Sequence, residues 1–311
     1  MPTTSSKIRI AILTGGENEE RSIALKSSLY IKDCLHGRYN YSLYDFPRDK
    51  DLFIQEHKDI DIVVPVFHGK GGEDGTIQGF LQTLNIPYIF SDVEAHAVGM
   101  NKELCKIIAT HNAIKTARWT RCSTDDYPLK PPFLPAVIKP IDNGSSIGVS
   151  IVHSDEQYLL AMRSIRKLNA EVLIEQYICG KEYTVAVING QHMKTMALPV
   201  IYIVPPSGFF DYENKYNGKS QEICPALIEN ELAEHLSAVA KMMHTAIGAR
   251  HISRTDCIVD EKGEVYFLEI NTIPGLTSQS LTPKAVSAAG LQFTSLLDLW
   301  ITETIKGQSR E

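Results

Sequence analysis

The stretch SRTDCIVDEKGEVYFLEI, residues 253–270, has the pattern of two β-strands joined by a tight turn. The residues at its centre, Asp260 to Gly263, are of types that are frequent in turns. If the turn has four residues, Val259 faces Glu264 across the hairpin. We therefore predict an antiparallel hairpin whose register is counted back from this turn.

Four polar residues of this hairpin are expected on one of its faces. The register places Arg254 opposite Glu269, and it places Asp256 opposite Phe267. Side chains alternate between the two faces of a strand, so polar residues two positions apart share a face. The residues predicted to share one face are Arg254, Asp256, Glu269 and Asn271. A slip of one residue would separate them, so the prediction depends on the register.

The chemistry of this face favours a site for a hard metal ion. Asp256, Glu269 and Asn271 offer two carboxylates and one amide oxygen, with no His or Cys beside them. Such oxygen ligands suit Mg²⁺ or Mn²⁺, which are usually shared with substrate phosphates, better than zinc. Arg254 would supply a fixed positive charge for a developing oxyanion or a phosphoryl group in transfer. From the hairpin alone, a surface ion pair between Arg254 and Glu269 remains an open alternative.

A second candidate feature is the loop of residues 144–148, GSSIG, which follows a strand ending at Lys139. Its small residues would let backbone N–H groups approach phosphate oxygens closely. Lys139 and Lys102 could add positive charge. A plain turn is an equally good explanation of the loop by itself.

The first ninety residues alternate strands with helices. Apolar strands are expected at 8–13 and 61–67, and helices at 19–35 and 76–84, with glycine-rich turns after the strands. This order is typical of an α/β fold with a doubly wound parallel sheet, which places ligands at such turns. Near Ser91 the pattern changes, and strands dominate after residue 172 until a helix at 230–247.

Composition excludes several classes of protein. The chain has 311 residues, 43% of them apolar, which is enough for a sizeable core and too apolar for a disordered chain. With 31 basic and 37 acidic residues the net charge is −6, so no basic surplus favours nucleic acid.

No segment predicts a membrane span or a signal peptide, because the uncharged stretches are too short or contain proline. Six cysteines occur singly, without a C-x-x-C pair, which argues against structural zinc and a disulfide framework. They are interpreted as thiols of a reducing cytoplasm.

Ordered motifs run from Gly15 to Pro283 and together resemble the D-alanine–D-alanine ligases of the ATP-grasp superfamily. They are Gly15-Gly16 with Glu20-Arg21, the run 68–79, Asn101-Lys102, Lys139-Pro140 with 144–148, Glu175 with Gly180 and Glu182, the run 210–216, Arg254 with Asp256, and the run 269–281. Any one of these blocks could arise by chance, whereas the ordered set is highly specific.

The resemblance implies where a nucleotide and its metals bind. Asp256, Glu269 and Asn271 would hold two Mg²⁺ or Mn²⁺ ions that bridge the phosphates of ATP. The other residues implied to bind ATP are Lys102, Lys139 and Lys215 at the phosphates, Ser145 and Ser146 in the glycine loop, Glu175, Tyr177 and Ile178 at the adenine, and Glu182 at the ribose. From the residues alone, Tyr177 could equally be a wall residue.

The resemblance also implies contacts for two D-alanines. Glu20 would pair with the ammonium of the first, with His68 beside it, although His68 could also be a turn-capping residue. Ser280 and the Leu281 N–H would bind the carboxylate of the second. Arg254 and the Gly275 N–H would hold the oxyanion of the tetrahedral intermediate. The trio implied to close a lid over the site is Glu20, Ser145 and Tyr216.

For the fold, the resemblance implies three parts: an N-terminal α/β domain at 1–91, a central ATP-grasp subdomain at 92–175, and a C-terminal subdomain at 176–311 with a lid loop at 205–223. The nucleotide would be held between the central and C-terminal subdomains. A homodimer in the cytoplasm, with no nucleic-acid or membrane partner, is also implied.

The function implied is ATP-dependent joining of two D-alanines through an acyl phosphate, for peptidoglycan precursors. One alternative is a depsipeptide ligase that makes D-alanyl-D-lactate, against which Lys215-Tyr216 argues because dipeptide-forming members carry this tyrosine. A non-catalytic ATP-grasp module that senses nucleotide is the alternative from another class.

Overall fold

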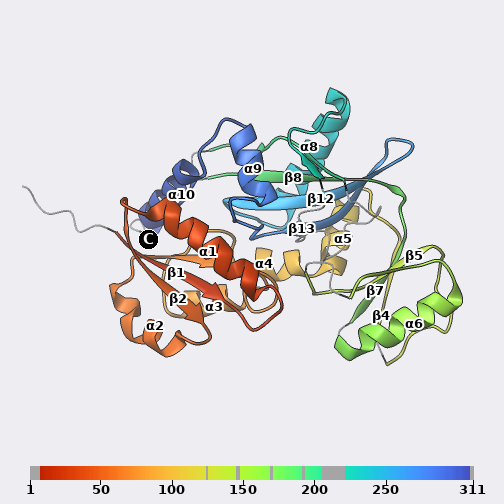
Figure 1. The fold of residues 1–311 in the computed structure, drawn as a ribbon, viewed down its shortest axis with the longest axis horizontal. Helices are drawn as coiled ribbons and strands as arrows, with labels where there is room; N and C mark the ends of the chain where they lie inside the picture. The colour runs from red at the N-terminus through yellow and green to blue at the C-terminus, as the bar shows by residue number, and fades with distance from the viewer. Residues whose placement is uncertain are drawn as a thin grey trace, which may run out of the picture.

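The computed structural model describes residues 8–123, 125–144, 148–168, 171–190, 193–204 and 221–308. Three sheets organise these residues. Figure 1 shows the N-terminal sheet at one end of the molecule, a small sheet with its own helix at the other end, and the largest sheet spanning both.

The N-terminal sheet is parallel, with strand order β2-β1-β3. Apolar side chains alternate along β1, so Ile10 and Ile12 pack with α1 whereas Ala11 and Leu13 pack with α2 and α3. Helices thus cover both faces, and the doubly wound parallel sheet predicted from the sequence is confirmed. The elements are β1 (Arg9–Gly15), α1 (Arg21–Leu35), β2 (Asn40–Phe46), α2 (Lys50–Glu56), η1 (His57–Asp59), β3 (Ile62–Val66) and α3 (Thr76–Thr83).

The small sheet is antiparallel, with strand order β4-β7-β5-β6. Helix α6 covers one face through Tyr158, Met162 and Ile165, and the other face is left toward the largest sheet. Its elements are β4 (Trp119–Cys122), β5 (Ala136–Pro140), β6 (Ser150–Val152), α6 (Asp155–Ile165), η2 (Arg166–Leu168) and β7 (Val172–Gln176).

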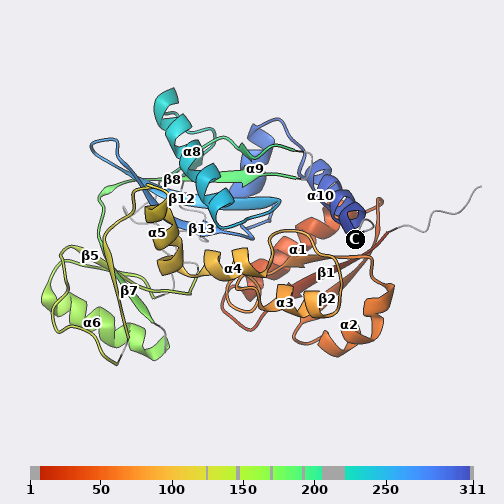
Figure 2. The same ribbon diagram turned by 180° about the vertical axis from the view of Figure 1, so that it is seen from behind.

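The largest sheet has the order β11-β10-β8-β12-β13, with β9 beside β8. One face packs on α5 and α8, which Figure 2 shows together with α4 from behind. The opposite face packs on the N-terminal sheet and α10 through Ala186, Ile188 and Ile252. The elements are β8 (Gly180–Ile188), β9 (Met196–Ala197), β10 (Ile201–Val204), β11 (Gln221–Ile223), β12 (Ile252–Asp260) and β13 (Val265–Asn271), with helices α4 (Val93–Met100), α5 (Lys102–His111), α8 (Asn230–Ala246), α9 (Leu281–Ala288) and α10 (Phe293–Gln308).

The β12–β13 hairpin differs in register from the prediction. Asp260 closes a shorter turn, since its N–H bonds to the Glu264 carbonyl at 3.1 Å and Gly263 has φ +80°. Val259 therefore pairs with Val265, not with Glu264. A bulge then shifts the register between Asp256 and Cys257.

The bulge determines which residues face each other at the far end of the hairpin. Cys257 pairs with Phe267 whereas Asp256 pairs with Glu269, which leaves Leu268 as the extra residue on β13. Arg254 pairs with Asn271. The predicted pairs were wrong by two residues, but two residues is a full side-chain period, so the predicted shared face is correct.

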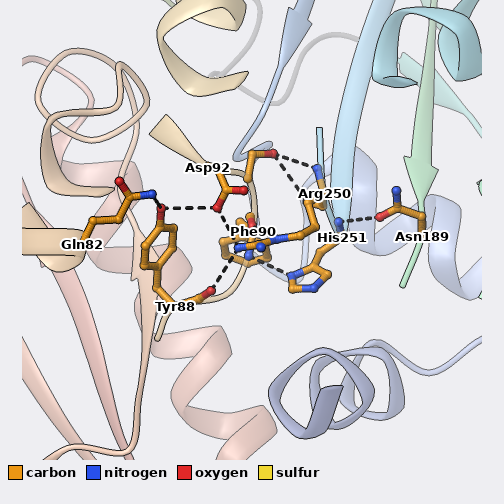
Figure 3. Close-up of polar contacts among 8 residues, drawn as sticks. Gln82, Tyr88, Phe90, Asp92, Asn189, Arg250 and His251 are labelled. Carbon is orange, nitrogen blue, oxygen red and sulfur yellow. Dashed lines mark hydrogen bonds and ion pairs between the residues drawn. The ribbon is translucent and has the colours of Figure 1, made fainter. Parts of the chain in front are cut away.

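The segment Tyr88–Asp92, which leaves the N-terminal sheet, is held by Arg250 just before β12. Arg250 donates from Nε to the Phe90 carbonyl at 2.9 Å and pairs through Nη2 with Asp92 at 3.0 Å. Its backbone N–H donates to Ser91 Oγ at 3.1 Å. We call Tyr88–Asp92 together with Arg250 and His251 the clasp; Figure 3 shows its polar contacts.

His251 completes the clasp. Its Nδ1 accepts from the Phe90 N–H at 2.9 Å, and its own N–H donates to Asn189 at 2.6 Å. The ring stacks on Trp300 of α10, with 5.5 Å between centroids. Phe90 and His251 both have positive φ, 73° and 68°, which costs a bulky residue energy and needs surrounding contacts to hold it. The clasp therefore fixes the N-terminal part against β12.

Candidate active site

A cavity of about 330 Å³ lies between the small sheet and the largest sheet. This is within the usual size of small-molecule sites. Apolar side chains such as Val137, Ile258 and Leu268 share its walls with charged groups. The residues predicted to bind nucleotide or metal that line it are Lys102, Lys139, Glu175, Tyr177, Ile178, Glu182, Asp256 and Glu269.

The three predicted metal ligands meet on one face of β12 and β13. Asp256 and Glu269 are direct cross-strand partners, and Asn271 is the partner of Arg254. Asp256 is buried, and Thr184 of β8 donates to its Oδ1 at 2.5 Å. No cluster of three or more His, Cys, Asp or Glu side chains that could hold a metal occurs among the described residues. The predicted set has only two such residues, because its third member is an asparagine.

Arg254 points along its strand to Asp256. Its Nε donates to Oδ1 and its Nη2 to Oδ2, both at 3.0 Å, a two-pronged contact that fixes the guanidinium plane. Burial first, and then the charge of Arg254, lower the pKa of His68. Arg254 thus binds Asp256 within the hairpin, and its charge also reaches His68 in the N-terminal part.

Lys102 lies beside these acids. Its ammonium donates to the Asn143 carbonyl at 2.6 Å and stands 3.6 Å from the Glu269 carboxylate. Asn101 caps α5 by accepting from the Leu104 N–H at 3.0 Å, which fixes the helix start that carries Lys102. The lysine is buried, so its charge acts with little screening by water.

Glu175 forms a buried group with two lysines. Lys139 lies 2.9 Å from Oε2 and Lys106 lies 3.0 Å from Oε1. Burial alone would raise the pKa of Glu175, but the two lysines outweigh it and hold that pKa below its usual value. Burial lowers the pKa of Lys106 to about 8.

Lys106 was not predicted from the sequence. Its ammonium also donates to Thr116 Oγ1 at 2.6 Å and lies over the Trp119 ring at 5.4 Å. The spacing of four from Lys102 on one helix could have indicated it, since such residues share a helix face.

Three loops converge on Glu20 at the end of β1. A side-chain carbon added at Gly69 would lie 2.5 Å from its Oε2, and one added at Gly144 would lie 2.7 Å from the same atom. The φ of +75° at Gly69 favours glycine there, and a larger residue at Gly144 would require the Glu20 side chain to move. Gly144, the first residue of the predicted glycine loop, thus lies beside Glu20.

His68 is buried near Glu20. Its Nε2 lies 3.1 Å from Ser27 Oγ. Burial lowers the pKa of His68 to about 4, so the ring is neutral at pH 7. Ser27, which the sequence did not indicate, also accepts from the Leu276 N–H at 3.4 Å and so links α1 to the loop that contains Gly275.

Glu73 is a second buried acid beside Glu20. Its two oxygens accept from the Gly69 N–H and the Ile273 N–H, each at 3.0 Å. Burial first, and then the charge of Glu20, raise the pKa of Glu73 to about 8. Glu73 thus joins the N-terminal part to the segment that follows β13.

Ser280 and Leu281 begin α9. Ser280 Oγ accepts from the Thr277 N–H at 3.1 Å, and Gly275 lies next to this hydroxyl. Leu281 is the first residue of the helix, so its N–H has no partner within the helix. The arrangement suits a carboxylate, because helix N-termini attract negative charge.

Comparison with known proteins identifies the family. Residues 110–302 match the family described as D-ala D-ala ligase C-terminus, and residues 49–91 match D-ala D-ala ligase N-terminus. The D-alanine–D-alanine ligase of Desulfotalea psychrophila is 39% identical over 307 residues, which cover 96% of this chain and 95% of that protein.

This chain belongs to the D-alanine–D-alanine ligase family.

Solved structures of the D-alanine–D-alanine ligase family share the fold. The Bacillus anthracis ligase complexed with ATP has a TM-score of 0.83 at 29% identity and covers 97% of this chain and 99% of its own. The VanG D-Ala:D-Ser ligase of Enterococcus faecalis has a TM-score of 0.80 at 26% identity, with coverage of 96% and 99%. The ATP-grasp fold predicted from the sequence is confirmed, and the fold by itself leaves the second substrate open.

Four residues implied by the D-alanine–D-alanine ligase resemblance lie outside the described residues, as does most of the predicted lid loop. They are Ser145, Ser146, Lys215 and Tyr216. Within the part that the structure describes, no helix has the length and apolar character needed to cross a membrane.

Proposed function

We propose that this chain is an ATP-dependent ligase that joins two D-alanines into D-alanyl-D-alanine, a precursor of peptidoglycan. The observation that carries the proposal is the direct pairing of Asp256 with Glu269 inside a cavity that Lys102 and Lys139 also line. Few functions besides the handling of a metal-bound polyphosphate need such an arrangement.

ATP would occupy the cavity between the small and largest sheets. Its adenine would lie against Tyr177 and Ile178, with Glu175 accepting from the amino group and Glu182 taking the ribose hydroxyls. Lys102 and Lys139, whose ammonium groups reach Glu269 and Glu175, would neutralise phosphate charge. Lys215, Ser145 and Ser146 keep their predicted places at the phosphates as part of this proposal.

The hairpin residues fit two Mg²⁺ or Mn²⁺ ions. Asp256, Glu269 and Asn271 are hard oxygen donors on one face, and the Nδ2 of Asn271 is buried without a hydrogen-bond partner. These three residues would hold the ions, which when bound supply positive charge to the phosphate oxygens.

The first D-alanine would bind between Glu20 and Arg254. Its ammonium would pair with Glu20, beside the neutral ring of His68. Its carboxylate would attack the γ-phosphorus of ATP, forming a C–O–P linkage as the bond to ADP breaks. Arg254 would stabilise the negative charge that develops in this step. The product is an acyl phosphate, which must be kept from water.

The second D-alanine would bind through its carboxylate to Ser280 Oγ and the Leu281 N–H. Its amine would attack the acyl carbon, and phosphate would leave as the C–O bond breaks. The oxyanion of the tetrahedral intermediate would be held by Arg254 and the Gly275 N–H. Glu20, Ser145 and Tyr216 would form the trio that closes the lid.

The assembly and location are also part of the proposal. We infer a cytoplasmic homodimer with an N-terminal domain at 1–91, a central subdomain at 92–175, and a C-terminal subdomain at 176–311 that carries the lid. The free cysteines among the described residues, with no disulfide, are consistent with a reducing compartment.

The test is an assay of ADP formation with D-alanine, L-alanine, D-lactate or D-serine, followed by analysis of the products. We expect ADP formation that needs D-alanine and yields the dipeptide. With D-lactate or D-serine in competition, mainly D-alanyl-D-lactate or D-alanyl-D-serine would contradict the proposed product. ATP binding without turnover would favour a nucleotide sensor.

A further inference from the structure

Asn18 connects the two loops that carry the predicted contacts to the first amino acid. It lies two residues before Glu20, in the loop that follows β1. Its Nδ2 donates to the His68 carbonyl at 2.8 Å and to the Lys70 carbonyl at 2.9 Å. Its Oδ1 accepts from the Glu20 N–H at 2.9 Å. One half-buried side chain thus donates two hydrogen bonds to a loop fifty residues away and accepts one within its own loop, from the residue Glu20 itself.

The packing at Gly69 shows how close this connection is. Gly69 has φ +75°, and a side-chain carbon there would lie 2.9 Å from Asn18 Nδ2 and 2.5 Å from Glu20 Oε2. The amide of Asn18 and the carboxylate of Glu20 therefore lie against the same glycine. A displacement of either loop would change the distance between Glu20 and His68.

We propose that Asn18 is a positioning residue for the first D-alanine, setting Glu20 and His68 at the spacing that its ammonium requires. The inference rests on the proposed function. Hydrogen bonds are directional, so the two from Asn18 Nδ2 orient the loop of His68, and the third orients the backbone of Glu20 relative to the same planar amide, which apolar contacts alone do not do. A serine here would have one donor and could not bond to both carbonyls.

Asn18→Asp is the sharpest variant. It keeps the size of the side chain and its acceptor for the Glu20 N–H, but it replaces both donors with a carboxylate oxygen facing two carbonyls. Asn18→Ser retains one donor and serves as a milder second variant. Asn112→Asp is the matched control, because Asn112 Nδ2 also donates to a backbone carbonyl, that of Ile108 at 2.8 Å, but at the end of α5.

The measurements are initial rates over a wide range of D-alanine concentrations, which give separate KM values for the first and second D-alanine, together with ATP affinity and the thermal midpoint. We expect Asn18→Asp to raise the KM for the first D-alanine about tenfold or more, Asn18→Ser to raise it less, and the other constants to stay within about twofold. Asn112→Asp should leave all of them near wild type.

Two results would overturn the proposal. One is a first KM for Asn18→Asp equal to that of Asn112→Asp. The other is a fall in thermal midpoint with both KM values and ATP affinity changed alike, which would indicate a general structural role. The failure of the proposed function is a separate result, because wild-type protein would then form no ADP in response to D-alanine.

Discussion

Lys106 shows how a residue outside a cavity can shape what the cavity binds. Its buried ammonium holds one oxygen of Glu175, while Lys139 holds the other. The carboxylate proposed to meet the adenine is therefore fixed on both sides. Without the second cation, a buried carboxylate would lose an ion pair and gain freedom to turn.

Lys106→Met is expected to raise the KM for ATP about tenfold while changing kcat little, because methionine has a similar length but removes the charge that holds Glu175 and the hydrogen bond to Thr116. Initial rates at varied ATP concentration measure the effect. Lys241→Met, on the exposed surface of α8, is the control. An unchanged KM for ATP would show that Lys139 alone is enough to orient Glu175.

The residues that sequence reasoning missed share one property. Each of Asn18, Ser27 and Lys106 bonds to a partner 50 or more residues away in the sequence. The partners are the His68 carbonyl, the Leu276 N–H and the Glu175 carboxylate. Spacing within one element can place neighbours on a face, but it cannot show which distant carbonyl an amide reaches. Glu20 and Asp256, by contrast, belong to short contiguous motifs that can be recognised in the sequence.

At the scale of elements, the β13 bulge places Glu269, one of the proposed metal ligands. A hairpin continued regularly from its turn would pair Asp256 with Leu268 and send Glu269 to the opposite face. The extra residue reverses this. Ile270 accordingly lies in the core beneath α5 and α8 with Phe267, three positions earlier. Neither the shorter turn nor the bulge was predicted. Each shifts the pairing by one residue, so together they shift it by two and leave the predicted face unchanged.

Glu269→Gln tests whether the carboxylate that the bulge positions binds metal. The amide keeps its shape but loses the charge, so kcat should fall about a hundredfold or more with little change in thermal midpoint. Mn²⁺ binding followed by electron paramagnetic resonance should weaken in parallel. Glu264→Gln, next to β13 in an exposed ion pair with Lys115, is the control. Near-normal turnover of Glu269→Gln would refute its role as a metal ligand.

At the scale of the molecule, the proposed reaction needs groups from both ends of the chain, and the clasp joins those ends. A shared apolar core already packs β1 and β3 against β12. Such packing is not directional, so the hydrogen bonds of Arg250 and His251 set the orientation. The doubly wound sheet could be predicted from its own pattern. The clasp could not, since it joins Phe90 to residues 160 positions later.

Arg250→Gln is expected to lower the thermal midpoint by about 4 °C, because it removes the contacts of one guanidinium with Phe90 and Asp92. Differential scanning calorimetry measures this shift. Arg9→Gln, which removes an exposed pair with Asp59, should change the midpoint by less than about 1 °C. Equal shifts in the two variants would mean that the apolar core alone orients the two ends.

Among the residues that the structure describes, four buried histidines make stability depend on acid pH. Burial lowers the pKa of His68 and His244 to about 4, and the pKa of His96 and His251 to about 3. Each folded-state pKa is below the unfolded value near 6.5, so the unfolded chain binds more protons in acid. Their contribution to stability is complete above pH 6.5 and is lost as the pH falls toward 4.

Glu73 acts in the opposite direction, because its folded pKa of about 8 is above its ordinary value of 4.5. Between pH 6.5 and 4.5 its proton offsets that of one histidine, which leaves three. At about 1.4 kcal/mol per proton and pH unit, the free energy of unfolding should fall by about 4 kcal/mol per pH unit there. Urea denaturation at pH 7, 6 and 5, followed by circular dichroism, measures the slope.

His244→Gln should reduce that slope by about a third, from three net protons to two, since the glutamine takes up no proton on unfolding. His235→Gln on the same helix is the matched control, because His235 is exposed. Stability that stays level from pH 7 to pH 5 would mean that these histidines are reached by water or protonated within the folded chain. If His251 is protonated within the folded chain, its Nδ1 can no longer accept from the Phe90 N–H, and the clasp would open in mild acid before the chain unfolds.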